Sequence, residues 1–269
     1  MNLIYKIFLN VYIMCLLSFF PLTLLAETPE EKGLRIAQEA HDYDEGFGDS
    51  EASMKMILRN AHGEESSRVF RSKTLEVEDD GDKTLFVFDS PRDVKGTATL
   101  TFTHKTDPDD QWLYLPALKR VKRITSDNRS GSFVGSEFAY EDLGSQEVEK
   151  YSRKFLRDEQ CPGFTEAVCY VFERYPLEKS SGYTRQVVWM DEEHYRVWKI
   201  DYFDRKNELL KTLVFENYEV FKDRHWRAMG LKMTNHQTKK STDIEINKMA
   251  LQVGLTSRDF DQKSLSRVR

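Results

Sequence analysis

The chain has little of the residues on which several protein classes depend. Its 269 residues include only 13 glycines and 7 prolines, which excludes collagen-like and low-complexity proteins. Neither sign of charge dominates, because 40 Lys and Arg face 45 Asp and Glu, and this mildly acidic balance argues against a dedicated nucleic-acid binder. A charged fraction of 32% is not a membrane-embedded composition, whereas a hydrophobic fraction of 39% is enough for a packed core.

Motifs of catalysis and metal binding are also missing from the sequence. The six histidines occur singly and none forms a His-x-x-x-His pair, so no zinc site is expected. The run 131–136 is not the Gly-x-Ser-x-Gly of a nucleophile elbow, and no phosphate-binding glycine loop occurs. The acidic run 107–110 lacks EF-hand spacing and fits a hairpin turn. We therefore expect no enzyme activity, no catalytic residues and no cofactor. A lipid-modifying enzyme, the remaining enzyme hypothesis, would need a buried Ser/His/Asp cluster.

Residues 1–26 differ from the rest of the chain. A lysine lies near the start, the stretch 7–26 is almost wholly apolar, and no acidic residue occurs before Glu27. A basic start, an apolar stretch and a small residue, Ala26, at the boundary are typical of a secretory signal peptide. We therefore expect export, cleavage near Glu27 and a single domain over residues 27–269. The alternative is an uncleaved membrane anchor, because the apolar stretch is long enough to span a bilayer.

Two cysteines remain after the signal segment. Cys161 and Cys169 flank a Pro-Gly turn and lie eight residues apart. Exported proteins fold in an oxidising compartment, so this even pair predicts a disulfide across a β-hairpin. No histidine or third cysteine flanks the pair, which makes a metal site the weaker interpretation.

One helix is predicted near the start of this domain. Thr28 can cap it, Pro29 suits the first helical position, and Glu31 completes a capping box. Apolar residues then recur at helical spacing up to His41.

After residue 50 the sequence has the pattern of consecutive antiparallel strands. Short runs rich in β-branched and aromatic residues alternate with turn clusters. The predicted strands are residues 52–60, 67–77, 83–89, 94–104, 111–115, 119–125, 150–157, 166–175, 183–190, 194–203, 208–218, 225–235 and 242–251. Alternation makes one face apolar and the other wet, and places Trp198, Ile200 and Tyr202 on the same face. With so little helix to cover it, such a sheet must curl on itself.

Aromatic side chains on these strands are the positive functional signal. A strongly curved sheet can enclose more volume than its own side chains fill, which would leave a cavity for a hydrophobic ligand. The candidate ligand-binding residues are Phe86, Phe88, Phe102, Trp112, Tyr114, Phe133, Phe138, Trp189, Trp198, Tyr202 and Leu231. The alternative interpretation is that most of them form the core.

Residues 125–143 separate the two halves of the strand pattern. The segment is rich in Ser and Gly but also carries apolar residues, among them Phe133 and Phe138. This mixture predicts a cover over an apolar surface, mobile above the cavity mouth, rather than a plain linker; the competing view is an ordered loop with permanent core anchors. The basic run 119–123 before it could hold a lipid phosphate or an acidic partner, or could simply be a solvated strand face.

Two central segments resemble a known family. Residues 112–124, WLYLPALKRVKRI, and 131–143, GSFVGSEFAYEDL, are similar to the bacterial outer membrane lipoprotein-sorting proteins, relatives of the periplasmic lipoprotein carriers. The resemblance extends over the chain after the signal segment, to the tail around Phe260 and Leu265.

The resemblance implies a fold and a role. The fold would be an unclosed β-barrel whose apolar concave face is covered by helices or loops. The role would be a periplasmic carrier that binds lipoprotein acyl chains or other lipids for transfer toward the outer membrane, with an inner-membrane transporter of the resistance-nodulation-division type as a partner. The alternative is an envelope sensor that binds a lipid or lipoprotein and regulates a membrane-bound partner. The family has no defined catalytic residues.

Overall fold

The computed structural model describes residues 26–267. The predicted signal segment therefore lies outside the described residues, apart from Ala26, and its cleavage stays a prediction. Within the described part of the chain, no helix is long and apolar enough to cross a membrane.

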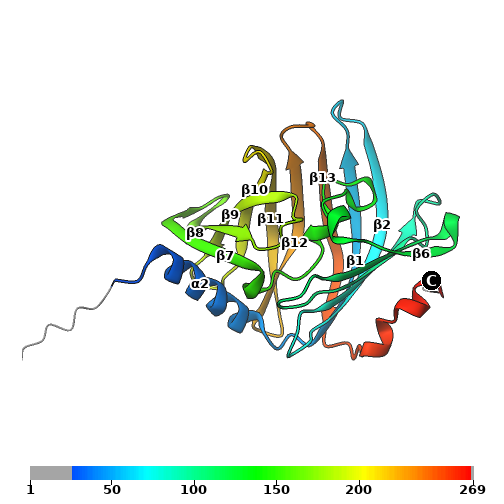
Figure 1. Cartoon of the computed structure of the whole chain (residues 1–269), viewed down its shortest axis with the longest axis horizontal. Coiled ribbons are helices and arrows are strands. Elements are labelled where there is room, and N and C mark those ends of the chain that lie inside the picture. The colour runs from blue at the N-terminus through cyan, green and yellow to red at the C-terminus, as the bar shows by residue number, and fades with distance from the viewer. Residues whose placement is uncertain (1–25, 268–269) are drawn as a thin grey trace, which may run out of the picture.

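The fold is a single antiparallel sheet of thirteen strands, preceded by one α-helix, α2 (Pro29–Asp44) (Figure 1). The first six strands are β1 (Asp49–Arg59), β2 (Glu65–Leu75), β3 (Lys83–Ser90), β4 (Ala98–Phe102), β5 (Asp110–Leu115) and β6 (Arg120–Arg123). The other seven are β7 (Tyr151–Cys161), β8 (Phe164–Pro176), β9 (Tyr183–Asp191), β10 (Val197–Asp204), β11 (Leu209–Phe221), β12 (His225–Asn235) and β13 (Ser241–Leu251). The predicted mainly β fold is confirmed.

The sheet is an unclosed barrel. Strands that follow one another in the chain pair with each other, except that β1 pairs with β13 and that β6 and β7 form the two free edges. Residues 124–150 connect these edges, and we call them the cover segment. Figure 1 shows the sheet bent around the cover segment, with α2 along β7 at one end of the sheet.

The predicted capping box of α2 is present. The Glu31 backbone N–H donates to Thr28 Oγ1 at 3.2 Å, and the Thr28 backbone N–H donates to Glu31 Oε2 at 2.8 Å. Gly33 lets the helix approach β7 closely, because a Cβ at this position would meet the Phe155 backbone nitrogen at 3.1 Å. Ile36 on the same helix is fully buried in the main core.

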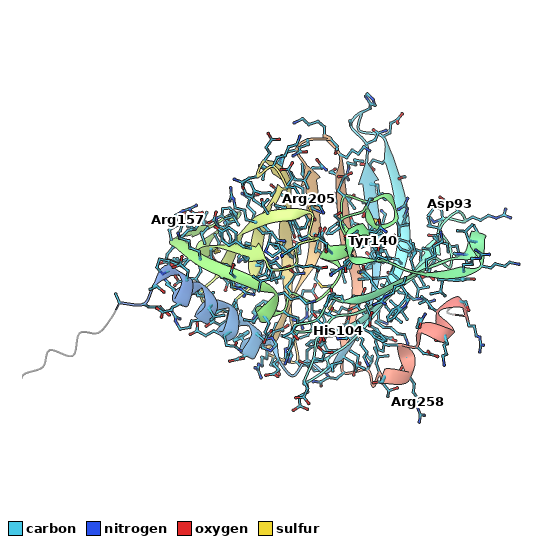
Figure 2. All side chains as sticks on the ribbon, viewed as in Figure 1. Asp93, His104, Tyr140, Arg157, Arg205 and Arg258 are labelled. Atoms are coloured by element: carbon cyan, nitrogen blue, oxygen red, sulfur yellow. A yellow bond between two sulfur atoms is a disulfide. The ribbon has the colours of Figure 1, made fainter. Side chains whose placement is uncertain are left out.

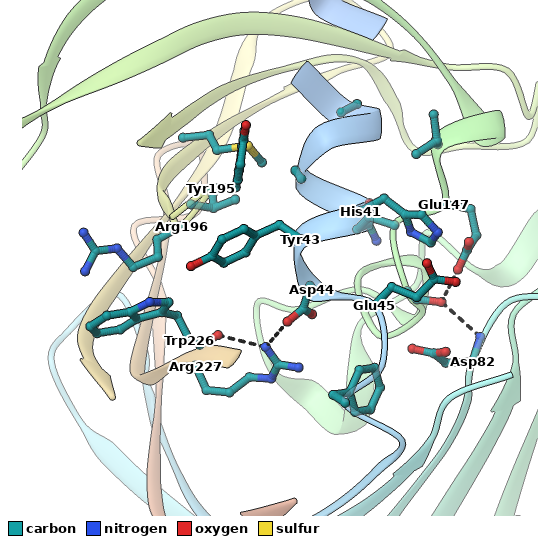
Figure 3. Close-up of a pocket in the computed structure, with 18 of the residues that line it drawn as sticks. His41, Tyr43, Asp44, Glu45, Asp82, Glu147, Tyr195, Arg196, Trp226 and Arg227 are labelled. Atoms are coloured by element: carbon teal, nitrogen blue, oxygen red, sulfur yellow. Dashed lines mark hydrogen bonds and ion pairs between the residues drawn. The ribbon is translucent and has the colours of Figure 1, made fainter. Parts of the chain in front are cut away.

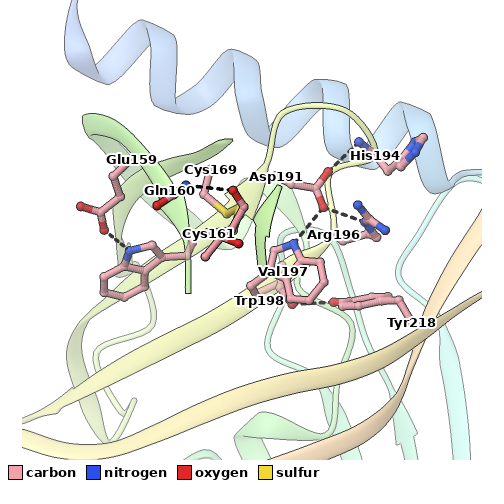
Figure 4. Close-up of a disulfide and its surroundings, with 12 residues drawn as sticks. Glu159, Gln160, Cys161, Cys169, Asp191, His194, Arg196, Val197, Trp198 and Tyr218 are labelled. Atoms are coloured by element: carbon pink, nitrogen blue, oxygen red, sulfur yellow. Dashed lines mark hydrogen bonds and ion pairs between the residues drawn. A yellow bond between two sulfur atoms is a disulfide. The ribbon is translucent and has the colours of Figure 1, made fainter. Parts of the chain in front are cut away.

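The sheet has an inner face, which is covered by α2 and the cover segment, and an outer face. The inner face carries the main core, to which strands β1–β3 and β7–β13 contribute. Two smaller clusters lie on the outer face: one where short C-terminal turns pack on β3–β5, and one around the Cys161–Cys169 disulfide. Figure 4 shows this disulfide, which confirms the predicted bridge between β7 and β8.

The cover segment is fixed to both halves of the sheet. Arg129 bonds Asp109 in the β4–β5 loop and Glu178 in the β8–β9 loop, so one side chain links the two ends of the open sheet. Asp142 accepts from Lys211 on β11, at 2.7 Å. Figure 2 shows Tyr140 of this segment at the centre of the molecule. The predicted segment 125–143 is therefore anchored to both halves of the sheet, and its mobility stays a prediction.

Candidate functional site

A cavity of about 520 Å³ lies between α2 and the inner face of β8–β12 (Figure 3). Its apolar wall comes from consecutive strands of the sheet. The residues of this wall are Phe172, Met190, Val197, Ile200, Phe215 and Leu231. The last turns of α2, the β2–β3 loop and the end of the cover segment form the rim. The volume is in the range of pockets that hold one small molecule, roughly 300–1,000 Å³.

The eleven predicted ligand-binding residues lie in three places. Phe86, Phe88, Phe133, Phe138, Tyr202 and Leu231 are on the inner face or in the cover segment above it. Phe102, Trp112 and Tyr114 are on the outer face, packed with the C-terminal turns. Trp189 and Trp198 are on the outer face beside the disulfide. Of these eleven residues, Leu231 alone lines the cavity under α2.

The position of Trp198 corrects the predicted alternation in β10. Val197 pairs with Met190 and Lys199 with Trp189, so a β-bulge shifts the register between them. The bulge turns Trp198 to the outer face, whereas Ile200 and Tyr202 remain inside as predicted. There Trp198 stacks on Phe164, with ring centroids 4.7 Å apart, and donates to Asp191 (Figure 4). At a bulge, a side chain can point to the face opposite to the one that two-residue alternation predicts. The sequence of apolar and polar residues does not show where the bulge lies.

Carboxylates gather at one side of the cavity rim (Figure 3). Burial, followed by the nearby charges of Glu147 and Glu76, raises the pKa of Asp82 to about 7. His41, Asp42 and Glu45 carry possible metal-ligand atoms within 4.8 Å of one another, but these side chains are exposed or half-buried at the end of α2. They form a loose polar rim rather than a built metal site.

Replacing Asp82 by asparagine is expected to stabilise the protein at high pH only. An unfolded chain ionises this carboxyl near pH 3.8, whereas the folded state keeps the proton up to about pH 7. Stability is therefore lost as the pH rises through this window, and Asp82→Asn, which cannot ionise, avoids the loss. Urea unfolding should show a gain of up to about 4 kcal/mol at pH 8 and none at pH 4.

Asp80, in the same loop, is the matched control. Hydrogen bonds from His104 and from backbone amides lower the pKa of its carboxyl, although burial opposes them. Its ionised form stabilises the fold above the unfolded pKa, so Asp80→Asn should lose stability at pH 8. Equal behaviour of the two variants would contradict the assignment of the raised pKa to Asp82.

Two buried arginines also line the cavity. Arg153 on β7 and Arg174 on β8 both line it, and their exposed fractions are 7% and 9%. Burial and the neighbouring charge of Arg174 lower the pKa of Arg153 to about 10. The sequence interpretation missed both residues. The sequence did contain a signal for Arg174. This charged residue lies two positions after the inward-facing Phe172 on the same strand, so two-residue alternation places it on the apolar face.

Comparisons with known proteins identify relatives of this chain. A family model described as "uncharacterized protein" matches residues 80–267. A structure assigned as an outer membrane lipoprotein-sorting protein domain, from Vibrio parahaemolyticus, is 56% identical and superposes with a TM-score of 0.86. The match covers 88% of this chain and 100% of that chain. The chain belongs to the outer membrane lipoprotein-sorting protein family. No curated protein matches it.

Other solved structures share the fold of this lipoprotein-sorting family member. A DUF1329 family protein from Desulfovibrio piger is 28% identical, with a TM-score of 0.83 over 88% of this chain and 99% of that one. A LolA superfamily protein from Nitrosomonas europaea is 17% identical, with a TM-score of 0.66 over 85% and 97%. At this identity the second likeness shows the fold alone, and the fold is the expected unclosed barrel.

The basic run before the cover segment comprises Lys119 and three residues of the free edge strand β6. Lys119, Arg120, Lys122 and Arg123 are all exposed there. Arg123 pairs with Asp110 on the neighbouring strand, as the solvated-face interpretation expects. The run lies apart from the cavity lining.

Proposed function

We propose that this chain is a periplasmic carrier that binds a lipidic cargo in the cavity under α2. The observation that supports the proposal is the cavity itself, whose wall is apolar and formed by the inner face of a curved sheet. Membership of the lipoprotein-sorting family makes lipid chains the natural occupant. The disulfide is consistent with an oxidising compartment.

The acyl chain would lie along the cavity wall. Each methylene group buried there contributes about 0.8 kcal/mol to binding, so a long chain can be held without any covalent step. Transfer toward the outer membrane then requires a partner that accepts the chain. The pairing with an inner-membrane transporter rests on the family resemblance alone.

Native mass spectrometry of the protein purified from its own periplasm tests the proposal. We expect a bound lipid with the wild-type protein. Val197→Trp should fill the cavity and abolish this adduct, because Val197 lies on the cavity wall. Val168→Trp is the matched control, since Val168 is 47% exposed and does not line the cavity.

The proposal fails if the wild-type protein carries no lipid and takes up none when offered. It also fails if both tryptophan variants retain the adduct to the same extent. An adduct that appears only together with a membrane-bound regulator would favour the sensor alternative.

A further inference from the structure

A polar row crosses the inner face from β7 to β12. Cross-strand pairing places its members directly opposite one another, as Arg153, Arg174, Gln186, Tyr202, Lys211 and Asn235. The neighbouring row toward α2 is wholly apolar and contains Phe172, Val188, Ile200, Leu213 and Met233. The cavity lies over the apolar side and reaches the polar row at Arg153 and Arg174.

Two members of this row, Lys211 and Asn235, have partners from the cover segment. Lys211 donates to Asp142 at 2.7 Å, and the Asn235 side-chain amide donates to Glu137 Oε2 at 2.7 Å. These contacts satisfy the buried polar groups and fix the segment. This part of the row is therefore structural.

The two arginines are different. They lie directly opposite each other on β7 and β8, and like charges in this position destabilise a sheet. Among residues 26–267, neither arginine has a carboxylate within ion-pair distance, whereas the buried Arg129 and Arg196 are each paired with an aspartate. A buried pair of unneutralised cations in a cavity is a feature of binding sites rather than of packing.

Arg153 and Arg174 differ in the hydrogen bonds that they donate. Arg153 donates to the carbonyl oxygens of Val148 and Tyr151, which ties it to the backbone at the end of the cover segment. Arg174 donates through Nε to Gln186 at 2.6 Å and stacks on the Tyr151 ring at 4.9 Å. No protein acceptor among the described residues bonds its two terminal nitrogens. A guanidinium held through Nε, with both terminal nitrogens free, is oriented to bind an anion with two oxygens.

We propose that Arg174, supported by Arg153, binds the anionic head of a single-chain amphiphile whose hydrocarbon chain lies on the apolar wall of the cavity. The shared chemistry of the head is a carboxylate or a phosphate, both of which match the guanidinium fork. This inference rests on the proposed function and adds a head-group preference to it.

Titration calorimetry with three single-chain probes tests the preference. The probes are palmitate, monopalmitoylglycerol phosphate and the uncharged monopalmitoylglycerol, and inorganic phosphate is the control without a chain. We expect the wild-type protein to bind at least one anionic probe about tenfold more tightly than the uncharged one. Arg174→Gln should remove this difference and leave binding of the uncharged probe within twofold, and Arg174→Lys should retain part of it. Arg157→Gln on β7, which removes an exposed arginine, is the matched control and should bind like the wild type.

A thermal melt separates binding from a structural role. Because Arg174 faces a like charge, Arg174→Gln should melt no lower than the wild type. The inference is overturned if the wild type binds charged and uncharged probes equally, if Arg174→Gln weakens all probes alike, or if inorganic phosphate binds as tightly as the chain-bearing phosphate. Failure of every chain-bearing probe to bind would instead overturn the proposed carrier function.

Discussion

Replacing Lys211 by methionine is expected to lower the free energy of unfolding by about 3–5 kcal/mol. Lys211 Nζ lies 2.7 Å from Asp142 Oδ2, and each side chain is only 4% exposed. Methionine has a similar size but no charge, so the Asp142 carboxylate would remain buried without its cation. The Tyr183 hydroxyl, which donates to Asp142 at 2.8 Å, replaces only part of that interaction. Thermal and urea unfolding measure the loss.

Lys232→Met is the matched control for this prediction. Lys232 lies on the next strand, β12, and pairs with Glu216 at 2.8 Å, but its side chain is 54% exposed. Exposed ion pairs contribute about 0–1 kcal/mol, so this variant should unfold almost like the wild type. Similar losses for Lys211→Met and Lys232→Met would show that burial does not set the strength of the pair.

Phe133→Ala is expected to destabilise the protein by about 3–5 kcal/mol. Phe133 is 1% exposed, and its ring centroid lies 5.8 Å from that of Phe86, 5.5 Å from that of Phe88 and 5.9 Å from that of Tyr140. Its removal leaves a hole in the middle of an aromatic cluster. At roughly 2–4 °C per kcal/mol for a domain of this size, the melting temperature should fall by at least about 6 °C.

This variant also decides between the two interpretations of the cover segment. As a core anchor, Phe133 should affect the melting temperature and leave the affinity for a bound lipid unchanged, because its side chain does not line the cavity under α2. As part of a mobile cover, it should affect lipid affinity and leave the melting temperature nearly unchanged. Phe221→Ala, which removes a half-buried ring outside the main core, controls for the loss of an aromatic residue.

The strands could be predicted from the sequence because two-residue alternation and turn residues are local signals. Each of the thirteen predicted runs overlaps one observed strand, and the helix begins at the predicted capping box. The joining of the two halves of the sheet through β1 and β13 could not be predicted in the same way, since pairing between distant strands leaves no local pattern. The family resemblance supplied the unclosed barrel instead.

The cavity was harder to predict than the fold. Aromatic content indicated an apolar interior but not which rings face it, so Trp112 and Trp189 were grouped with inner-face residues although they pack on the outer face. Arg174 gave the more specific signal, because it lies in line with the inward-facing Phe172 on the same strand, and a charge is costly to bury without a partner. Only the pairing of β7 with β8 shows that its neighbour is a second arginine.

The pairing order of the sheet also has a consequence for how the chain folds. All strand pairs except β1–β13 join neighbours in the chain, so they can form as successive hairpins with little loop-closure entropy. The β1–β13 pair joins Ser50 to Leu251 and can form only when the two halves of the chain meet. The loop-closure cost therefore falls on one long-range encounter, which we expect to be a slow step of folding. The order of the strands thus divides the sheet into two meanders, β1–β6 and β7–β13, which can form independently. The two meanders join where β1 pairs with β13.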